Sequence, residues 1–121
     1  MKILIVDDST AMRLMIIRTL RQAGLSGHDF SQAEDGEKGL AQIRAESPEL
    51  VLADWNMPNL TGIEMLEALR EEDNDVRVGF ITTESTSAMR SRAMAAGALF
   101  LVGKPFTVES FEQALAPVLA A

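Results

Sequence analysis

Five short runs rich in apolar residues alternate along this chain with stretches of helical periodicity. The runs lie at 3–6, 28–33, 50–54, 76–82 and 99–102, and the second is the weakest. Runs of this length bounded by turn signals predict buried strands. Strands that alternate with helices predict a parallel sheet with right-handed crossovers and helices on both faces. This alternation constrains the fold more than any other feature, although periodicity alone does not give the order of the strands.

The first two helical stretches carry recognisable start and stop signals. The first begins near Ser9 and stops at Gly24, which is placed to form a left-handed cap. Its predicted apolar stripe consists of Met12, Met15, Ile16 and Leu20. The second runs to about Ala45, and Asp35 is its predicted N-cap.

Three further helices complete the pattern. Thr61 and Glu64 have the spacing of a capping box, which predicts the start of the third helix. The fourth spans roughly 85–96, and the fifth opens at Thr107. The predicted apolar stripe of the fifth consists of Phe111, Leu115, Val118 and Leu119. Pro117 should kink or fray its last turn.

Length and composition fit one domain over residues 1–121. A chain of 121 residues with 47% apolar residues can build one full core. No apolar run approaches the roughly 20 residues of a membrane helix, and the chain has neither a signal-peptide pattern nor a cysteine. We therefore expect a cytoplasmic protein without membrane insertion, as a monomer or weak dimer. The net charge of −7 argues against direct nucleic-acid binding.

Charged residues stand directly after three of the apolar runs. Asp7 and Asp8 follow the first run, Asp54 ends the third, and Lys104 follows the fifth. Open α/β sheets bind their ligands at the carboxyl ends of the strands. If these strands lie side by side, three carboxylates and one ammonium meet at a single sheet edge.

Three neighbouring carboxylates cannot all ionise cheaply, because like charges raise one another's pKa, so either one acid is protonated or a cation lies among them. Oxygen ligands without cysteine suit Mg²⁺, which typically takes one or two carboxylates, waters and a substrate phosphate. A carboxylate at such a site can attack a phosphoryl group in line and form an aspartyl phosphate. Thr82, at the end of the fourth run, adds a hydroxyl that can bond a phosphate oxygen.

The chain resembles the receiver domains of two-component response regulators. The similarity runs from Lys2 to about Val118 and includes five parts in order and spacing: Asp7-Asp8, Asp54 with Met57-Pro58 and Gly62, Thr82, and Lys104-Pro105. The segment 54–59 is especially similar to stand-alone chemotaxis regulators of this family. The resemblance implies a doubly wound, flavodoxin-like sheet of five parallel strands in the order 2-1-3-4-5 with five helices.

The resemblance also implies a role for each site residue. Asp54 would accept a phosphoryl group from the phosphohistidine of a sensor histidine kinase or phosphotransfer protein. Mg²⁺ would be held by Asp8, Asp54 and the backbone carbonyl of Asn56, with Asp7 acting through water. Lys104 would pair with the phosphate, and its bond to Pro105 would be cis.

Switching and hydrolysis are implied in the same way. Thr82 would hydrogen-bond the phosphate and pull its loop inward, while Asn56 and Glu84 would line the path of the hydrolytic water. A downstream protein would read the surface formed by the fourth helix, fifth strand and fifth helix. The chain would catalyse its own phosphorylation and dephosphorylation without being a dedicated turnover enzyme. It departs from the family at the strand-five switch position, where Leu101 replaces the usual tyrosine or phenylalanine.

Several alternatives stay open. A receiver cut from a longer regulator would have the same sequence features. A metal-dependent phosphohydrolase of the haloacid-dehalogenase kind would need an acid at position 56, where Asn56 stands. A flavodoxin-like cofactor binder would need a phosphate-binding loop in place of Asp7-Asp8. A pseudo-receiver that works without phosphate is disfavoured by Asp8, Asp54 and Lys104.

Two conspicuous residues have structural interpretations. His28 is the only histidine, and it falls on the weak second strand, so we interpret it as a strand or edge residue. Trp55 directly follows Asp54 and should pack beside the site.

Overall fold

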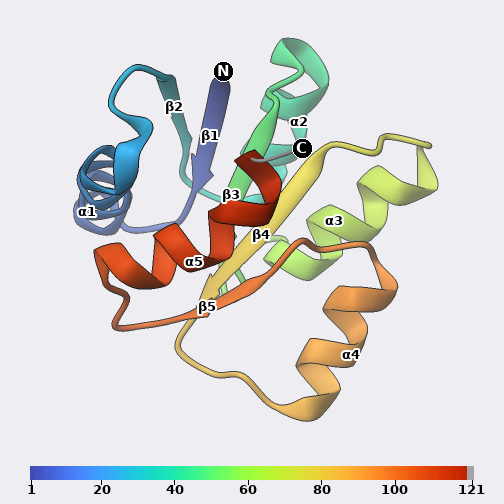
Figure 1. Cartoon of the computed structure of the whole chain (residues 1–121). Helices are drawn as coiled ribbons and strands as arrows, with labels where there is room; N and C mark the ends of the chain where they lie inside the picture. Colours follow the sequence, from blue (N-terminus) through green and yellow to red (C-terminus); the bar gives the residue numbers. More distant parts are fainter. Residues whose placement is uncertain (120–121) are drawn as a thin grey trace.

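The computed structural model describes residues 1–119, which form a central sheet with helices on both sides (Figure 1). The strands are β1 (Lys2–Val6), β2 (Asp29–Ala33), β3 (Leu50–Asp54), β4 (Arg77–Thr82) and β5 (Leu101–Gly103). All neighbouring strands are parallel, and their order is β2-β1-β3-β4-β5. The predicted doubly wound α/β fold with the order 2-1-3-4-5 is therefore confirmed.

The helices divide into two layers. They are α1 (Thr10–Leu20), which continues into a π-helical segment η1 (Arg21–Leu25), α2 (Gly36–Glu46), α3 (Gly62–Glu71), α4 (Ser87–Ala95) and α5 (Val108–Leu119). One apolar cluster joins α1 and α5 to one face of the sheet, and a second joins α2, α3 and α4 to the other. The strands are apolar on both sides because both faces are covered: residues 3–6 of β1 and 50–53 of β3 are all 0% exposed.

The predicted capping residues occupy their places. Ser9 and Asp35 accept backbone N–H groups at the starts of α1 and α2. Thr61 and Glu64 form the complete capping box of α3, each bonding the other's backbone. Gly24 lies inside η1, and its left-handed φ of 107° interrupts the helical backbone there, at the residue predicted to stop the helix.

The apolar stripe predicted for α1 is partly wrong. Ile16 and Leu20 are buried as predicted, but Met15 is 53% exposed, and Ile17 is buried instead. Each helical residue turns by 100°, so Met15 and Ile17 lie on opposite sides of Ile16. The sheet covers the side that carries Ile17, and periodicity alone could not choose between the two.

The start of the fourth helix differs from the prediction. The α4 helix begins at Ser87, not near Ser85, and the Thr86 hydroxyl caps it by accepting the Met89 N–H at 3.1 Å.

The α5 helix contains Pro117, as predicted, and runs to Leu119. Its predicted apolar stripe is partly wrong: Phe111 and Leu115 are buried, but Leu119 is 44% exposed, because the last turn lies outside the cluster that buries those two residues.

The fifth strand is displaced from its apolar run. Residues 99–102 were expected, but β5 spans Leu101–Gly103. Leu99 and Phe100 still bond to β4, through Leu99 N to Val78 O at 2.8 Å and Phe80 N to Phe100 O at 3.0 Å. Apolarity marks the residues that pack, whereas strand limits follow the backbone ladder, and the two need not coincide.

Phe100 and Leu101 lie on opposite faces of the sheet, as alternation in a strand requires. Phe100 packs with the α1–α5 cluster, and Leu101 packs with the cluster on the other face. Gly79 of β4 provides the room for Phe100: a Cβ built at Gly79 would lie 2.3 Å from the phenylalanine ring. The large side chain just before β5 is thus accommodated by the absence of a side chain on β4.

Candidate functional site

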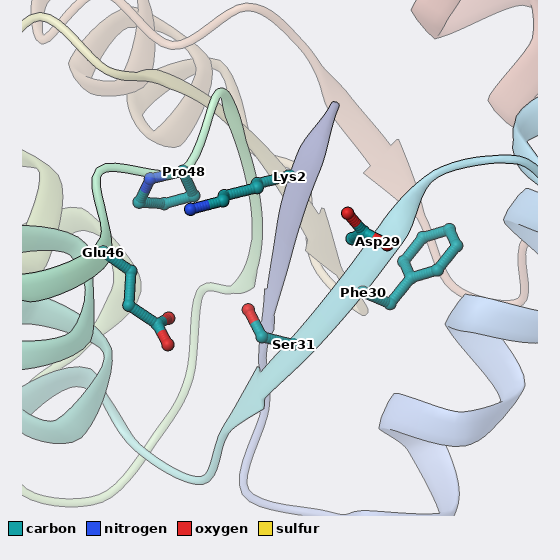
Figure 2. Close-up of a pocket in the computed structure, with 6 residues that line it drawn as sticks. All are labelled: Lys2, Asp29, Phe30, Ser31, Glu46 and Pro48. Carbon is teal, nitrogen blue, oxygen red and sulfur yellow. The ribbon is translucent and has the colours of Figure 1, made fainter.

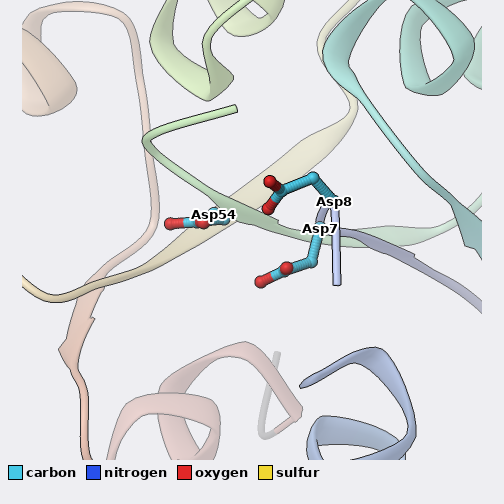
Figure 3. A group of neighbouring side chains, drawn as sticks. All are labelled: Asp7, Asp8 and Asp54. Carbon is cyan, nitrogen blue, oxygen red and sulfur yellow. The ribbon is translucent and has the colours of Figure 1, made fainter. Parts of the chain in front are cut away.

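Three acids meet where β1 and β3 end. Val6 of β1 is paired with Ala53 of β3, so Asp7 and Asp54, which follow them, emerge side by side. One carboxylate oxygen from each of Asp7, Asp8 and Asp54 lies within 4.8 Å of the other two (Figure 3). Asp7 is buried, Asp8 is exposed and Asp54 is intermediate. The cluster therefore has a buried floor and a side open to solvent.

Lys104 reaches this cluster from the far side of β4. Its ammonium nitrogen lies 3.3 Å from Oδ2 of Asp7 and 3.5 Å from Oδ2 of Asp54. The Lys104 N–H also donates to the Thr82 carbonyl at 2.8 Å, which links the loops after β4 and β5. The Lys104–Pro105 peptide is cis, as the family resemblance implied. The structure thus brings together the three acids and the one lysine that the sequence placed at strand ends.

The electrostatic balance of the cluster disfavours ionisation of Asp54. Burial raises the pKa of the Asp54 carboxyl, and the negative charge of Asp7 raises it further. The ammonium of Lys104 and the backbone N–H of Asn56 act in the opposite direction but do not compensate. The net result is a pKa above the usual range for aspartate, as expected of neighbouring carboxylates short of positive charge.

The loop after β1 is held by contacts that fix Asp7. The Ser9 N–H donates to Oδ1 of Asp7 at 2.9 Å. Arg13 of α1 donates to the Asp7 carbonyl at 2.6 Å and to Oε1 of Gln32 at 3.0 Å. Nothing in the linear sequence pattern indicates that the Arg13 guanidinium folds back to a carbonyl six residues earlier.

The loop after β3 is compact and begins at Trp55. The Trp55 side chain is 8% exposed and packs at a tilt on Phe80, with ring centroids 5.3 Å apart, so it lies beside the site as expected. The Gly62 N–H donates to the Trp55 carbonyl at 2.9 Å and closes the loop. A Cβ at Gly62 would lie 2.2 Å from the carbonyl oxygen of Asp54, so only glycine fits there.

The other predicted site residues lie around the cluster. Thr82 is 1% exposed, and its hydroxyl accepts the Glu84 N–H at 3.2 Å. The Asn56 and Glu84 residues are exposed on the loops after β3 and β4. Leu101 is half-buried on the face covered by α4. Their roles in switching and hydrolysis stay predictions.

Two features of the structure lie away from these acids. His28 precedes β2, and its Nδ1 lies 2.7 Å from the α-amino nitrogen of Met1, at the amino ends of the strands. A pocket of about 170 Å³ opens at the same end (Figure 2). It is lined by Lys2, Asp29, Phe30, Ser31, Glu46 and Pro48. Neither feature shares a residue with the acid cluster.

Comparisons with known proteins match this chain to receiver domains and chemotaxis proteins. A family model described as "Response regulator receiver domain" matches residues 3–116. A Rhizobium etli protein described as "Probable chemotaxis protein CheY" is 36% identical, over 99% of this chain and 93% of that protein. The "Chemotaxis protein CheY" of Pseudomonas aeruginosa is 35% identical over 93% and 91%. Among solved structures, Vibrio cholerae chemotaxis protein CheY4 has a TM-score of 0.83 and 32% identity, with 97% of each chain covered.

Within residues 1–119, no helix has both the length and the apolar character needed to cross a bilayer.

Proposed function

This chain belongs to the response regulator receiver domain family, and from that premise we propose that it is a phosphorylation-activated switch with Asp54 as the phosphoacceptor. The observation that carries the proposal is the meeting of Asp54 with Asp7, Asp8 and Lys104 at one sheet edge. A strand-end carboxylate flanked by two acids and an ammonium has what a metal-assisted acyl phosphate requires: a nucleophile, oxygen ligands and a cation for the phosphate.

The acids fit Mg²⁺ by their chemistry and spacing. Mg²⁺ prefers carboxylate and carbonyl oxygens and keeps several waters, and the oxygens of Asp7, Asp8 and Asp54 are close enough to face one ion. We assign Asp8, Asp54 and the backbone carbonyl of Asn56 as ligands, with Asp7 acting through water. When bound, Mg²⁺ neutralises the oxygens of the transferring phosphoryl group.

Phosphoryl transfer forms one new bond, between Asp54 and phosphorus. A carboxylate oxygen of Asp54 forms the bond to phosphorus as the phosphorus–nitrogen bond of the donor's phosphohistidine breaks. The departing imidazole nitrogen keeps the electron pair and takes up a proton. Lys104, which already lies 3.5 Å from Asp54, pairs with a phosphate oxygen. Asn56 and Glu84 flank the approach of the water that later hydrolyses the aspartyl phosphate.

The proposed switch is carried by Thr82. In this structure the hydroxyl oxygen accepts the Glu84 N–H, and a phosphate on Asp54 offers an acceptor oxygen to which the hydroxyl hydrogen can donate. Because the backbone N–H of Lys104 donates to the Thr82 carbonyl, movement of the loop after β4 would be transmitted to the end of β5. To invert a 1:99 population, the phosphate must favour the active state by ~5.5 kcal/mol.

The readout we propose is a protein–protein contact. A sensor histidine kinase or phosphotransfer protein supplies the phosphoryl group, and a downstream protein binds the face made by α4, β5 and α5. The similarity to chemotaxis proteins makes a stand-alone chemotaxis regulator the favoured setting. We also propose that residues 1–121 form a single receiver domain and that the protein is located in the cytoplasm.

The proposal is tested with purified protein and a small phosphodonor. Mg²⁺ is titrated while Trp55 fluorescence is followed, then acetyl phosphate is added and the intact mass is measured. We expect a saturable Mg²⁺ response and a base-labile gain of one phosphoryl group. The Asp54→Asn variant should gain none, whereas Asp75→Asn, which removes an exposed acid, should gain one. A wild-type protein without a Mg²⁺ response or adduct refutes the proposal.

A further inference from the structure

The loop after Asp54 is attached to the start of α2 through Asp35 and Asn59. Asp35 is 8% exposed, and its two carboxylate oxygens have different partners. Oδ1 accepts the Lys38 N–H at 2.8 Å and caps α2, while Oδ2 accepts the Asn59 side-chain amide at 3.3 Å. Asn59 has φ 70°, a left-handed conformation that asparagine tolerates. One buried carboxylate therefore joins a helix start to the loop of the candidate site.

A backbone contact beside this hydrogen bond supports the attachment. A Cβ at Gly36 would lie 2.2 Å from the carbonyl oxygen of Leu60. The first residue of α2 thus packs directly on the loop backbone, which is possible only because Gly36 has no side chain. Together the two contacts hold residues 59–60 against α2.

The loop is then fixed on both sides of Asn56. On one side, the Trp55 carbonyl accepts the Gly62 N–H at 2.9 Å. On the other, Asn59 bonds Asp35. Asn56, whose carbonyl we assign to Mg²⁺, lies between these two attachments. A ligand on a loop that is already ordered binds without the cost of ordering that loop.

We propose that Asp35 is a positioning residue for the metal site, which acts through Asn59 to hold the loop after Asp54 ready for Mg²⁺. This inference rests on the proposed function. Asp35 does not touch the ion; it determines whether the loop that contributes a ligand is ordered before the ion arrives. Outer partners of metal ligands typically contribute 10–100-fold to affinity, and for this indirect contact we expect about tenfold, the lower end of that range.

Two substitutions remove the contact from either side. Asp35→Ser keeps an oxygen that can cap α2 but loses the one that reaches Asn59. Asn59→Gly keeps the left-handed backbone accessible and removes the amide without changing any charge. Glu37→Ser is the matched control, because Glu37 is an exposed acid in the first turn of α2. It removes the same charge near the site without touching the loop.

Calorimetric titration with Mg²⁺ measures the affinity of wild type, the variants and the Asp35→Ser/Asn59→Gly double variant. We expect about tenfold weaker binding in each single variant and little further loss in the double variant, because both remove one contact. Glu37→Ser should bind within about twofold of wild type, as expected for a screened exposed charge.

Acrylamide quenching of Trp55 in metal-free protein gives a second readout. Trp55 lies in the same loop, so quenching should increase in both single variants and stay unchanged in Glu37→Ser. Loss of a helix cap alone would not produce this effect in Asn59→Gly, and that variant also serves if Asp35→Ser does not fold.

The outcomes separate the two proposals. If wild type binds Mg²⁺ and Asn59→Gly binds it equally well, or if the two substitutions are fully additive, the role of Asp35 is refuted and the proposed function stands. If wild type does not bind Mg²⁺, the proposed function fails and this inference fails with it.

Discussion

The ammonium of Lys104 lies between two aspartates of the acid cluster, 3.3 Å from Asp7 and 3.5 Å from Asp54. All three side chains are at most 12% exposed. Removing one member of a buried ion pair leaves an uncompensated charge, which usually costs more than an exposed pair ever contributes. The stability of the metal-free protein therefore depends on Lys104.

Lys104→Gln should lower the free energy of unfolding at pH 7 by about 3 kcal/mol, and saturating Mg²⁺ should restore part of the loss, since it supplies positive charge to the same acids. Urea unfolding with and without Mg²⁺ measures both effects. Lys38→Gln breaks an exposed pair with Glu34 and should change stability by less than ~1 kcal/mol. Equal effects of the two substitutions would contradict the importance of the buried pair.

Asp54→Asn should stabilise the metal-free protein at neutral pH. The pKa of Asp54 is raised in the folded state, chiefly by burial, so the folded protein binds this proton more tightly than the unfolded chain does. The stability of wild type therefore falls as pH rises from the ordinary aspartate value through the raised pKa. The variant lacks this dependence, so at pH 7 it should be more stable than wild type, by a difference that shrinks as the pH falls toward 4.

Urea unfolding from pH 4 to 8 measures this difference, and Asp75→Asn is the control because its acid is exposed. A wild-type stability that rises through this pH range relative to Asp54→Asn would contradict the prediction.

Gly79→Ala should destabilise the fold by about 1–3 kcal/mol, the usual cost of overpacking, because the new methyl group would lie 2.3 Å from the Phe100 ring. Gly103→Ala is the matched control on the adjacent strand, where a Cβ meets nothing within 4 Å, and it should be nearly neutral. Thermal unfolding of both variants measures the difference.

The double variant Gly79→Ala/Phe100→Ala tests the cause. If the ring is what the methyl group meets, the double variant should be more stable than the sum of the two single effects predicts. Additive effects would show that the strain arises elsewhere.

Arg70 should control the local stability of the end of α4. Its guanidinium donates to the carbonyls of Ala96 at 2.9 Å and Asn74 at 2.8 Å, joining the end of α3 to the end of α4. Arg70→Lys cannot make both bonds in the same geometry. Hydrogen exchange should become faster in α4 while β1 and β3 keep their protection, whereas uniform loss of protection would indicate global destabilisation instead.

The sequence predicted the meeting of the acids and the lysine on one condition. Parallel strands place their carboxyl ends at one edge, so Asp7, Asp54 and Lys104 were expected to approach one another if their strands lie side by side. The strand order came from the family resemblance. Capping residues were predictable because a cap is a local interaction, as Asp35 and Thr61 illustrate.

Contacts between distant segments were not predictable from the sequence. The bond from Asn59 to Asp35 joins two loops, and neither residue alone signals the other. The exposure of Met15 and the burial of Ile17 depend on how α1 rolls against the sheet, which periodicity leaves open. The room for the Phe100 ring depends on the missing side chain of Gly79, a packing relation between residues far apart in the sequence.

The uniform direction of the five strands has a practical value for handling this protein. Every connection from a helix back to a strand lies at the amino ends of the strands, the end that carries His28 and not the acid cluster. A fluorophore or affinity handle inserted in the turn at 26–27, where a side chain added to Gly27 meets no atom within 4 Å, would be separated from Asp54 by the full length of a strand. Such a probe can report on the molecule without altering its chemistry.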